Sequence, residues 1–216
     1  MDSAITIIFQ LAILIFSVVI HEVSHGLAAN ALGDPTAKYA GRLTLNPLAH
    51  LDPVGSVLLP LLSFFLGGFI IGYAKPVPYN PHLLRVRNQD VGSAMVGIAG
   101  PGSNIAIAII FGLLVRTFSS WAPLFGGAAG ALVEVLSSIA LINLVLAVFN
   151  LIPIPPLDGS KVLFSFLPYH WQGIRIFLER FGFILLLVFI IYFSQWILPL
   201  VVWLFHLISG GVSPFR

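Results

Sequence analysis

One short segment of the sequence combines residue types that can bind a metal ion and hydrolyse a bond. It reads His21-Glu22-Val23-Ser24-His25, with two histidines four positions apart and an acid beside the first. On a helix, positions i and i+4 share a face, so both imidazoles can reach one divalent cation while the carboxylate lies at its rim. This spacing is typical of zinc hydrolases, in which the metal lowers the pKa of a bound water to about 7 and the acid accepts the water's proton.

The sequence around this motif excludes an ordinary solvated helix face. Residues 4–20 carry no charge, and residues 27–32 continue the same predicted helix without one. An ionisable group in such a helix costs about 2.5–3.5 kcal/mol on membrane-insertion scales. A bound metal ion would compensate this cost, and a purely structural polar cluster is the alternative.

A third ligand is expected from Asp158, because the sequence has no cysteine and any metal must be held by His, Asp or Glu. Asp158 ends the stretch 150–158 (NLIPIPPLD), whose three prolines within four residues prevent a helix and impose an extended backbone. Gly159 then permits a close backbone approach. The carboxylate would complete a His, His and Asp set suited to a catalytic zinc. Alternatively, this stretch is only a helix exit, with Asp158 capping the next helix.

Composition indicates that these residues lie in a membrane protein. Of the 216 residues, 58% are hydrophobic and 8% are charged, whereas soluble domains carry about 25% charged residues. A net charge of +2 on so apolar a chain is too small for a nucleic-acid surface. We therefore expect a lipid bilayer as the surroundings and no nucleic acid as a partner.

Five apolar runs are candidates to cross a bilayer, which takes about 20 residues. They cover residues 4–32, 54–73, 91–115, 128–152 and 181–208. The connections are too short for a separate folded domain, so residues 1–216 are predicted to form a single all-α integral-membrane domain. The first run has no basic residue before it and contains His21 and Glu22, which favours a retained helix over a signal peptide.

The run 54–73 is the exception, because Pro60, Gly67, Gly68 and Gly72 interrupt it. If it enters and leaves on one side, eight of the ten Lys and Arg residues share that side, and only Arg116 and Arg216 lie opposite. The positive-inside rule expects this split for four full crossings with both termini outside. We therefore expect a re-entrant segment; its apolar length favours the alternative, a fifth full crossing.

Residues 100–104 (GPGSN) add a third motif in a middle run. Together with the His21–His25 and 150–159 motifs, it makes the sequence resemble the site-2 protease family of intramembrane zinc metalloproteases, over about residues 18–163. The family often carries a soluble peptide-binding or nucleotide-binding module, for which this chain leaves no room. The glycines of the third motif are expected to let its helix approach its neighbours closely.

The resemblance implies a role for six residues. His21, His25 and Asp158 would bind one Zn²⁺ per chain, and Glu22 would be the catalytic base. Asn104 and Asn150 would lie near the active site and hold an extended substrate strand or stabilise the oxyanion. Bonding between neighbouring helices is the alternative for both amides.

Two features of the connection after the first run are less specific. The stretch 38–45 (KYAGRLTL) alternates and could be a short strand of a small β-hairpin beside the active site. A plain connection agrees equally well with it. His50 follows in a segment that we interpret as an interfacial loop, although a gating or ligand-supporting role is an alternative.

The sequence thus predicts a zinc endopeptidase that hydrolyses peptide bonds in or near transmembrane segments of membrane-protein substrates, as in regulated intramembrane proteolysis. We expect it in the cytoplasmic membrane of a prokaryote, with the active site toward the basic, cytoplasmic side. The alternative is a non-proteolytic membrane protein that binds or carries a divalent metal. Such a carrier needs no general base, so Glu22 distinguishes the two. The substrate, its cleavage site, gating and oligomeric state do not follow from the sequence.

Overall fold

The computed structural model describes residues 3–52, 75–125 and 127–213. Among these residues, four helices are long and apolar enough to cross a membrane. They are α1 (Ser3–Ala31), α4 (Gln89–Phe125), α5 (Gly127–Asn150) and α7 (Gln172–Ser209). The described residues therefore bear out an all-α architecture with four candidate membrane-spanning helices, and they contain no strand.

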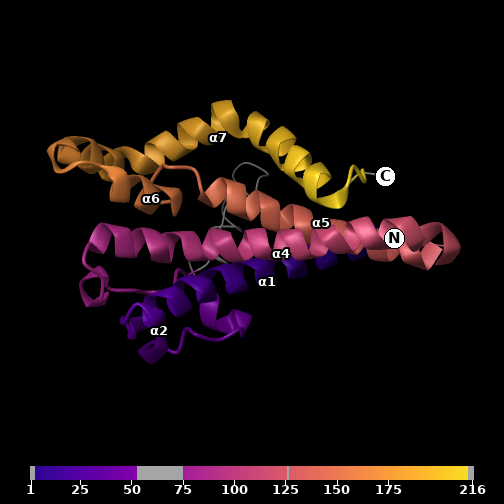
Figure 1. Ribbon diagram of the computed structural model, residues 1–216, viewed down its shortest axis with the longest axis horizontal. Coiled ribbons are helices and arrows are strands. Elements are labelled where there is room, and N and C mark those ends of the chain that lie inside the picture. The colour runs from indigo at the N-terminus through magenta and orange to yellow at the C-terminus, as the bar shows by residue number, and fades with distance from the viewer. Residues whose placement is uncertain (1–2, 53–74, 126, 214–216) are drawn as a thin grey trace.

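Shorter helices lie in the connections. Within the described residues they are α2 (Thr36–Tyr39), α6 (Gly159–Phe166) and three 3-10 helices, at Pro47–His50, Pro81–Leu83 and Tyr169–Trp171. Both α2 and α6 lie at one end of the bundle, and both chain termini lie toward the other (Figure 1).

The helix ends follow from local backbone preferences. After α1, Gly33 adopts a φ of +102°, which other residues rarely do, and the N–H of Asp34 returns to the carbonyl of Ala29 at 2.9 Å. After α7, Gly210 ends the helix in the left-handed conformation, with its N–H bonded to His206. The prolines that follow α5 stop that helix at Asn150.

Helix α4 is central, because it packs against α1, α5, α6 and α7 (Figure 1). The main apolar core joins α4, α5 and α7 through Ala108, Val115, Val133, Leu136, Ala140, Leu144, Val201 and Phe205. Many other large apolar side chains of these helices are exposed, α7 above all. A bundle with a small core and an apolar outer surface fits a lipid environment.

The connections on either side of residues 53–74 meet at one end of the bundle. The N–H of Lys75 donates to the carbonyl of His50 at 2.9 Å, and the N–H of Arg85 donates to that of Leu32 at 2.7 Å. The basic residues of both connections therefore share that end. The segment 54–73 itself, for which we expected a re-entrant path, lies outside the described residues.

No strand forms over Lys38–Leu45, where the sequence pattern agreed equally well with a short strand and with a plain connection. The residues before Ala40 belong to α2, and a turn at Gly41, with a φ of +67°, separates them from an irregular stretch that leads to His50. Alternation alone does not make a strand without a partner to pair with. This part of the chain is the plain connection, fixed by buried Arg42, which donates to the carbonyl of Ala49. His50 is buried in it and bonds to the carbonyl of Thr44 at 2.9 Å.

Candidate metal centre

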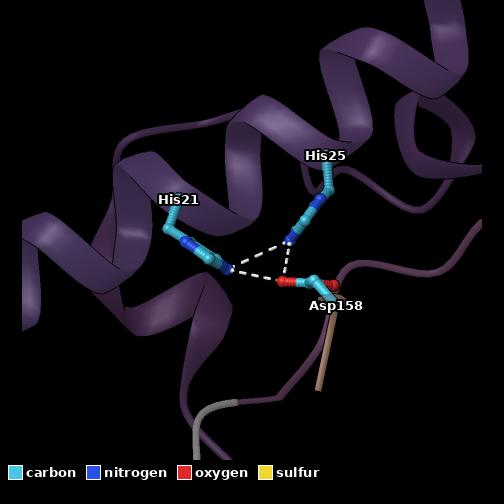
Figure 2. Close-up of side chains that lie close together, drawn as sticks. All are labelled: His21, His25 and Asp158. Atoms are coloured by element: carbon cyan, nitrogen blue, oxygen red, sulfur yellow. Dashed lines mark hydrogen bonds and ion pairs between the residues drawn. The ribbon is translucent and has the colours of Figure 1, made fainter. Parts of the chain in front are cut away.

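Three side chains that the sequence singled out converge at the basic end of the bundle. His21 and His25 lie one turn apart on α1, and Asp158 lies directly before α6. The Nε2 atoms of the two histidines are 3.1 Å apart, and each is 3.1 Å from Oδ2 of Asp158 (Figure 2). All three residues are buried, with exposures of 6–7%.

The donor atoms of this triangle fit a divalent cation. Nδ1 of His25 lies 2.6 Å from the carbonyl oxygen of Val96, which can only accept, so Nδ1 carries the proton and Nε2 of the neutral ring presents a lone pair. Nδ1 of His21 is likewise 2.6 Å from Oδ1 of Asn104. Three lone pairs that face one another repel unless a cation lies between them. A tetrahedral zinc with ligands at about 2.0–2.1 Å holds them about 3.3 Å apart, close to this spacing.

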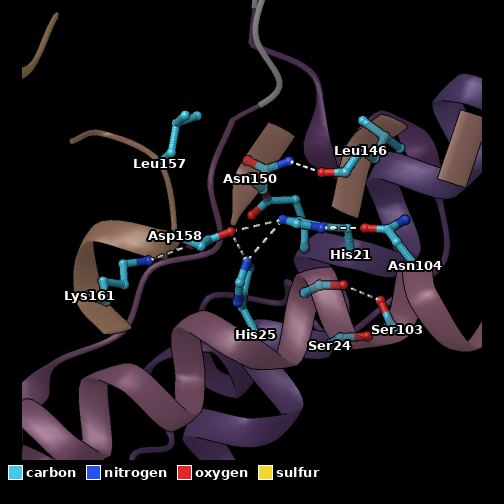
Figure 3. Close-up of polar contacts among 12 residues, drawn as sticks. His21, Ser24, His25, Ser103, Asn104, Leu146, Asn150, Leu157, Asp158 and Lys161 are labelled. Atoms are coloured by element: carbon cyan, nitrogen blue, oxygen red, sulfur yellow. Dashed lines mark hydrogen bonds and ion pairs between the residues drawn. The ribbon is translucent and has the colours of Figure 1, made fainter. Parts of the chain in front are cut away.

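Asp158 uses its two oxygens differently. Oδ2 faces the imidazoles, while Oδ1 accepts from Nζ of Lys161 at 2.9 Å (Figure 3). The Lys161 ammonium at this distance favours the anionic form of the carboxylate. The side chain of Asp158 makes no capping bond to α6, which argues against a mere helix cap.

Lys161 was not singled out in the sequence. Its ammonium also lies over the ring of Tyr79, 5.4 Å from the centroid, so it is fixed from two sides. A basic residue one turn after an expected ligand is the signal that would have indicated it.

Glu22 is held by the connection that precedes α4. Its Oε2 accepts from the backbone N–H of Val77 at 2.8 Å. Val77 is buried, and the prolines on either side of it favour an extended backbone. The carboxylate thus has a fixed direction beside the two histidines, through a residue that sequence reasoning missed because a backbone donor leaves no signature in the residue type.

Two glycines make the close packing around the site feasible. A Cβ atom on Gly100 would lie 2.4 Å from Nε2 of His25 and 2.7 Å from Cε1 of His21, and one on Gly159 would lie 2.2 Å from the carbonyl oxygen of Leu151. Neither contact is sterically allowed. The expectation of close approach is therefore confirmed at Gly100 and Gly159, whereas a Cβ on Gly102 would meet nothing within 4 Å.

The two asparagines have different surroundings (Figure 3). Asn104 is fully buried: its Oδ1 lies 2.6 Å from Nδ1 of His21, and its Nδ2 donates to Asn143 on α5. The bond between neighbouring helices, given as the alternative, is therefore present, and a role of Asn104 toward substrate stays a prediction. Asn150 is half-buried, and its Nδ2 donates to the carbonyl of Leu146 on its own helix at 2.9 Å. A role of Asn150 in holding substrate stays a prediction.

Comparison with known proteins identifies similar sequences. Residues 125–189 match the family described as Peptidase family M50. The "Putative zinc metalloprotease YwhC" of Bacillus subtilis is 38% identical over 176 residues, which cover 81% of this chain and 76% of that protein. The "Putative zinc metalloprotease Rip2" of Mycolicibacterium smegmatis is 31% identical over 204 residues, covering 93% and 73%. No solved structure matches the chain.

Proposed function

Because this chain belongs to peptidase family M50, the site-2 protease family, and is a metallopeptidase, we propose that it is an intramembrane zinc endopeptidase. It hydrolyses peptide bonds in or near the transmembrane segments of membrane-protein substrates. The convergence of His21, His25 and Asp158 within a bundle of membrane-crossing helices carries this proposal.

His21, His25 and Asp158 would hold one Zn²⁺ per chain. Three protein ligands are the number that catalytic zinc sites use, and the fourth position is left for water or substrate. When bound, the ion would polarise the scissile carbonyl and lower the pKa of water to about 7. The carboxylate of Asp158 and the neutral imidazoles are the hard and borderline donors that zinc accepts.

Glu22 would move the proton. Since Val77 donates to Oε2, we assign proton transfer to Oε1, the other oxygen of the same carboxylate. Oε1 takes a proton from the attacking water as the carbon–oxygen bond forms. It then gives this proton to the nitrogen of the leaving amine as the carbon–nitrogen bond breaks.

The distribution of charge supports an active site near the cytoplasmic face. The metal centre lies toward the end of the bundle where α1 ends, α4 and α7 begin and α2 and α6 lie (Figure 1). In these parts of the chain or in the connections beside them are eight of the ten basic residues: Lys38, Arg42, Lys75, Arg85, Arg87, Lys161, Arg175 and Arg180. Arg116 lies beside Gly210, toward the opposite end. Under the positive-inside rule the basic end faces the cytoplasm, so hydrolytic water need not cross the bilayer.

Glu22→Gln tests the reaction separately from metal binding. The amide keeps the shape of the side chain but cannot accept the proton, so we expect the zinc content to be retained and cleavage to fall by about 10²–10⁴-fold. The measurement is cleavage of a single-pass reporter peptide in proteoliposomes, with zinc determined on the same preparation.

Two results would contradict the proposal. Continued cleavage by Glu22→Gln would reject Glu22 as the base. An unaltered protein that cuts no single-pass substrate but moves zinc across the vesicle membrane would favour a metal carrier.

A further inference from the structure

A chain of buried polar side chains connects His21 to the backbone of α5. It consists of Asn104 on α4 and Asn143 on α5, both 0% exposed, with Ser17 of α1 beside them at 4%. Oδ1 of Asn104 is 2.6 Å from Nδ1 of His21, and Nδ2 of Asn104 donates to Oδ1 of Asn143 at 2.8 Å. The chain ends where Nδ2 of Asn143 donates to the carbonyl of Ile139 at 2.8 Å.

The direction of every bond in this chain follows from its last member. The carbonyl oxygen of Ile139 can only accept, so the NH₂ group of Asn143 must face it, and Oδ1 of Asn143 must face Asn104. That oxygen in turn requires the NH₂ group of Asn104, which leaves Oδ1 of Asn104 toward His21. Nδ1 of His21 is therefore the protonated nitrogen, and Nε2 presents its lone pair to Asp158.

Ser17 locks the same arrangement. Its Oγ accepts the second hydrogen of Asn143 Nδ2 at 2.9 Å, and its carbonyl lies 3.5 Å from Nδ2 of Asn104. Ser17 and His21 are one turn apart on α1 and so share a face. Both hydrogens of the Asn143 amide thus have partners, and a rotated amide would set an oxygen against the carbonyl of Ile139.

We propose that Asn143 is a positioning residue that, through Asn104, holds His21 in the tautomer able to bind the metal. This inference rests on the zinc site of the proposed function. His25 needs no such chain, because the carbonyl of Val96 fixes its tautomer directly. For His21 two side chains replace that carbonyl, and partners of this kind orient metal ligands and raise their affinity.

Asn143→Leu removes the acceptor while keeping a similar volume. The Asn104 amide is then free to turn its NH₂ group toward His21, which selects the tautomer with the proton on Nε2. In that tautomer Nε2, the atom that faces His25 and Asp158, has no lone pair with which to bind a cation. We expect the zinc affinity to fall by about 10–100-fold, the usual loss when such a partner is removed.

A second substitution separates orientation from packing. Asn104→Asp supplies a carboxylate, which can only accept and therefore keeps the proton of His21 on Nδ1 whatever residue 143 is. In the Asn143→Leu background we expect Asn104→Asp to restore most of the lost affinity. In the protein with Asn143 present, Asn104→Asp should raise the zinc affinity by a factor at least about tenfold smaller. Asn104 is already oriented there, and the new carboxylate would face Oδ1 of Asn143.

The measurement is competition between the metal-stripped protein, purified in detergent, and a chromophoric zinc chelator. Ser138→Ala is the matched control on α5, since Oγ of Ser138 donates only within its own helix, to the carbonyl of Glu134, and it should leave the affinity unchanged. Equal gains from Asn104→Asp in both backgrounds, or no loss in Asn143→Leu, would overturn the positioning role. Zinc binding that survives His21→Ala would instead refute the metal site of the proposed function.

A spectroscopic measurement needs no variant at position 143. In metal-free protein labelled with ¹⁵N-histidine at a pH where the rings are neutral, we expect the His21 signals of the Nδ1–H tautomer, assigned by their loss in His21→Gln. Signals of the Nε2–H tautomer would overturn the proposal.

Discussion

At the scale of single residues, the two imidazoles lie directly against the backbone of α4. Gly100 provides the room, since any Cβ there would overlap both rings. A Cβ atom on Gly102, two positions further along the helix, would meet nothing within 4 Å. The chain therefore contains a pair of glycines on one helix, of which only one bears on the metal ligands.

Gly100→Ala should displace the histidines and lower the zinc affinity by more than about tenfold, since overpacking of this kind costs about 1–3 kcal/mol. Gly102→Ala is the control, and it should bind zinc as the unaltered protein does while gaining up to about 1 kcal/mol of stability from the better helix former. Zinc titration and thermal unfolding in detergent measure both effects. Equal affinities in the two variants would show that the ligands do not depend on this contact.

The grouping of His21, His25 and Asp158 could be predicted from the sequence because their residue types and local surroundings carry the signal. A close approach of another helix at Gly100 could also be expected, although not which side chains would lie there. Val77 and Asn143 could not, because their contacts span 55 and 39 residues of sequence, to Glu22 and Asn104 respectively. The sequence does contain one indication of Asn143: it is an amide within an apolar run, where an unbonded polar side chain is costly.

At the scale of elements, the connections before and after residues 53–74 support the site from the side of α1. Asp34 ties them together: it is fully buried and accepts hydrogen bonds from the backbone N–H and hydroxyl of Thr36 and from the N–H of Asn80. The second connection also carries Val77, whose N–H orients Glu22. Loss of Asp34 should therefore lower the stability of the folded protein, and it should lower catalysis only indirectly, through the displaced connection.

Asp34→Ala should lower the stability by about 1–3 kcal/mol, because it leaves buried donors without an acceptor. Burial raises the pKa of the Asp34 carboxyl, but the hydrogen bonds from Thr36 and Asn80 lower it by more, so the folded-state pKa lies below the ordinary value. The stabilisation by the ionised Asp34 carboxylate is complete above the ordinary pKa of about 3.9, and it is lost as the pH falls through the lower pKa of the folded state.

Thermal unfolding in detergent at neutral and at acidic pH tests this prediction. The difference in stability between the unaltered protein and Asp34→Ala should shrink as the medium is acidified. Glu134→Gln, which removes an exposed acid on α5, should show no comparable effect. A difference that stays constant down to low pH would contradict an ionised Asp34 as its cause.

Four of the five apolar runs, all except 54–73, lie largely within α1, α4, α5 or α7, so the sequence predicted these helices well. Their ends were less accurate: α7 begins at Gln172, whereas the run was expected from Phe181, because polar residues at a membrane surface continue a helix without an apolar signal. No strand forms at Lys38–Leu45, because a pattern of alternation over eight residues is weak evidence for a strand and the turn at Gly41 interrupts the stretch.

At the scale of the whole molecule, the site depends on three parts of the chain that only the fold brings together. Helix α1 supplies His21 and His25, the proline-rich stretch after α5 supplies Asp158, and α4 contacts both histidines through Asn104 and the carbonyl of Val96. Asp158 lies 133 residues after His25 in sequence. Under the proposed function, one shared ion accounts for this convergence of buried polar groups in an apolar bundle.

Anomalous diffraction at the zinc absorption edge, from crystals of the purified protein, tests this claim most directly. We expect one strong peak within about 2.0–2.2 Å of His21 Nε2, His25 Nε2 and an oxygen of Asp158. A peak bound by other residues, or side chains of these three too far apart to share one ion, would contradict it.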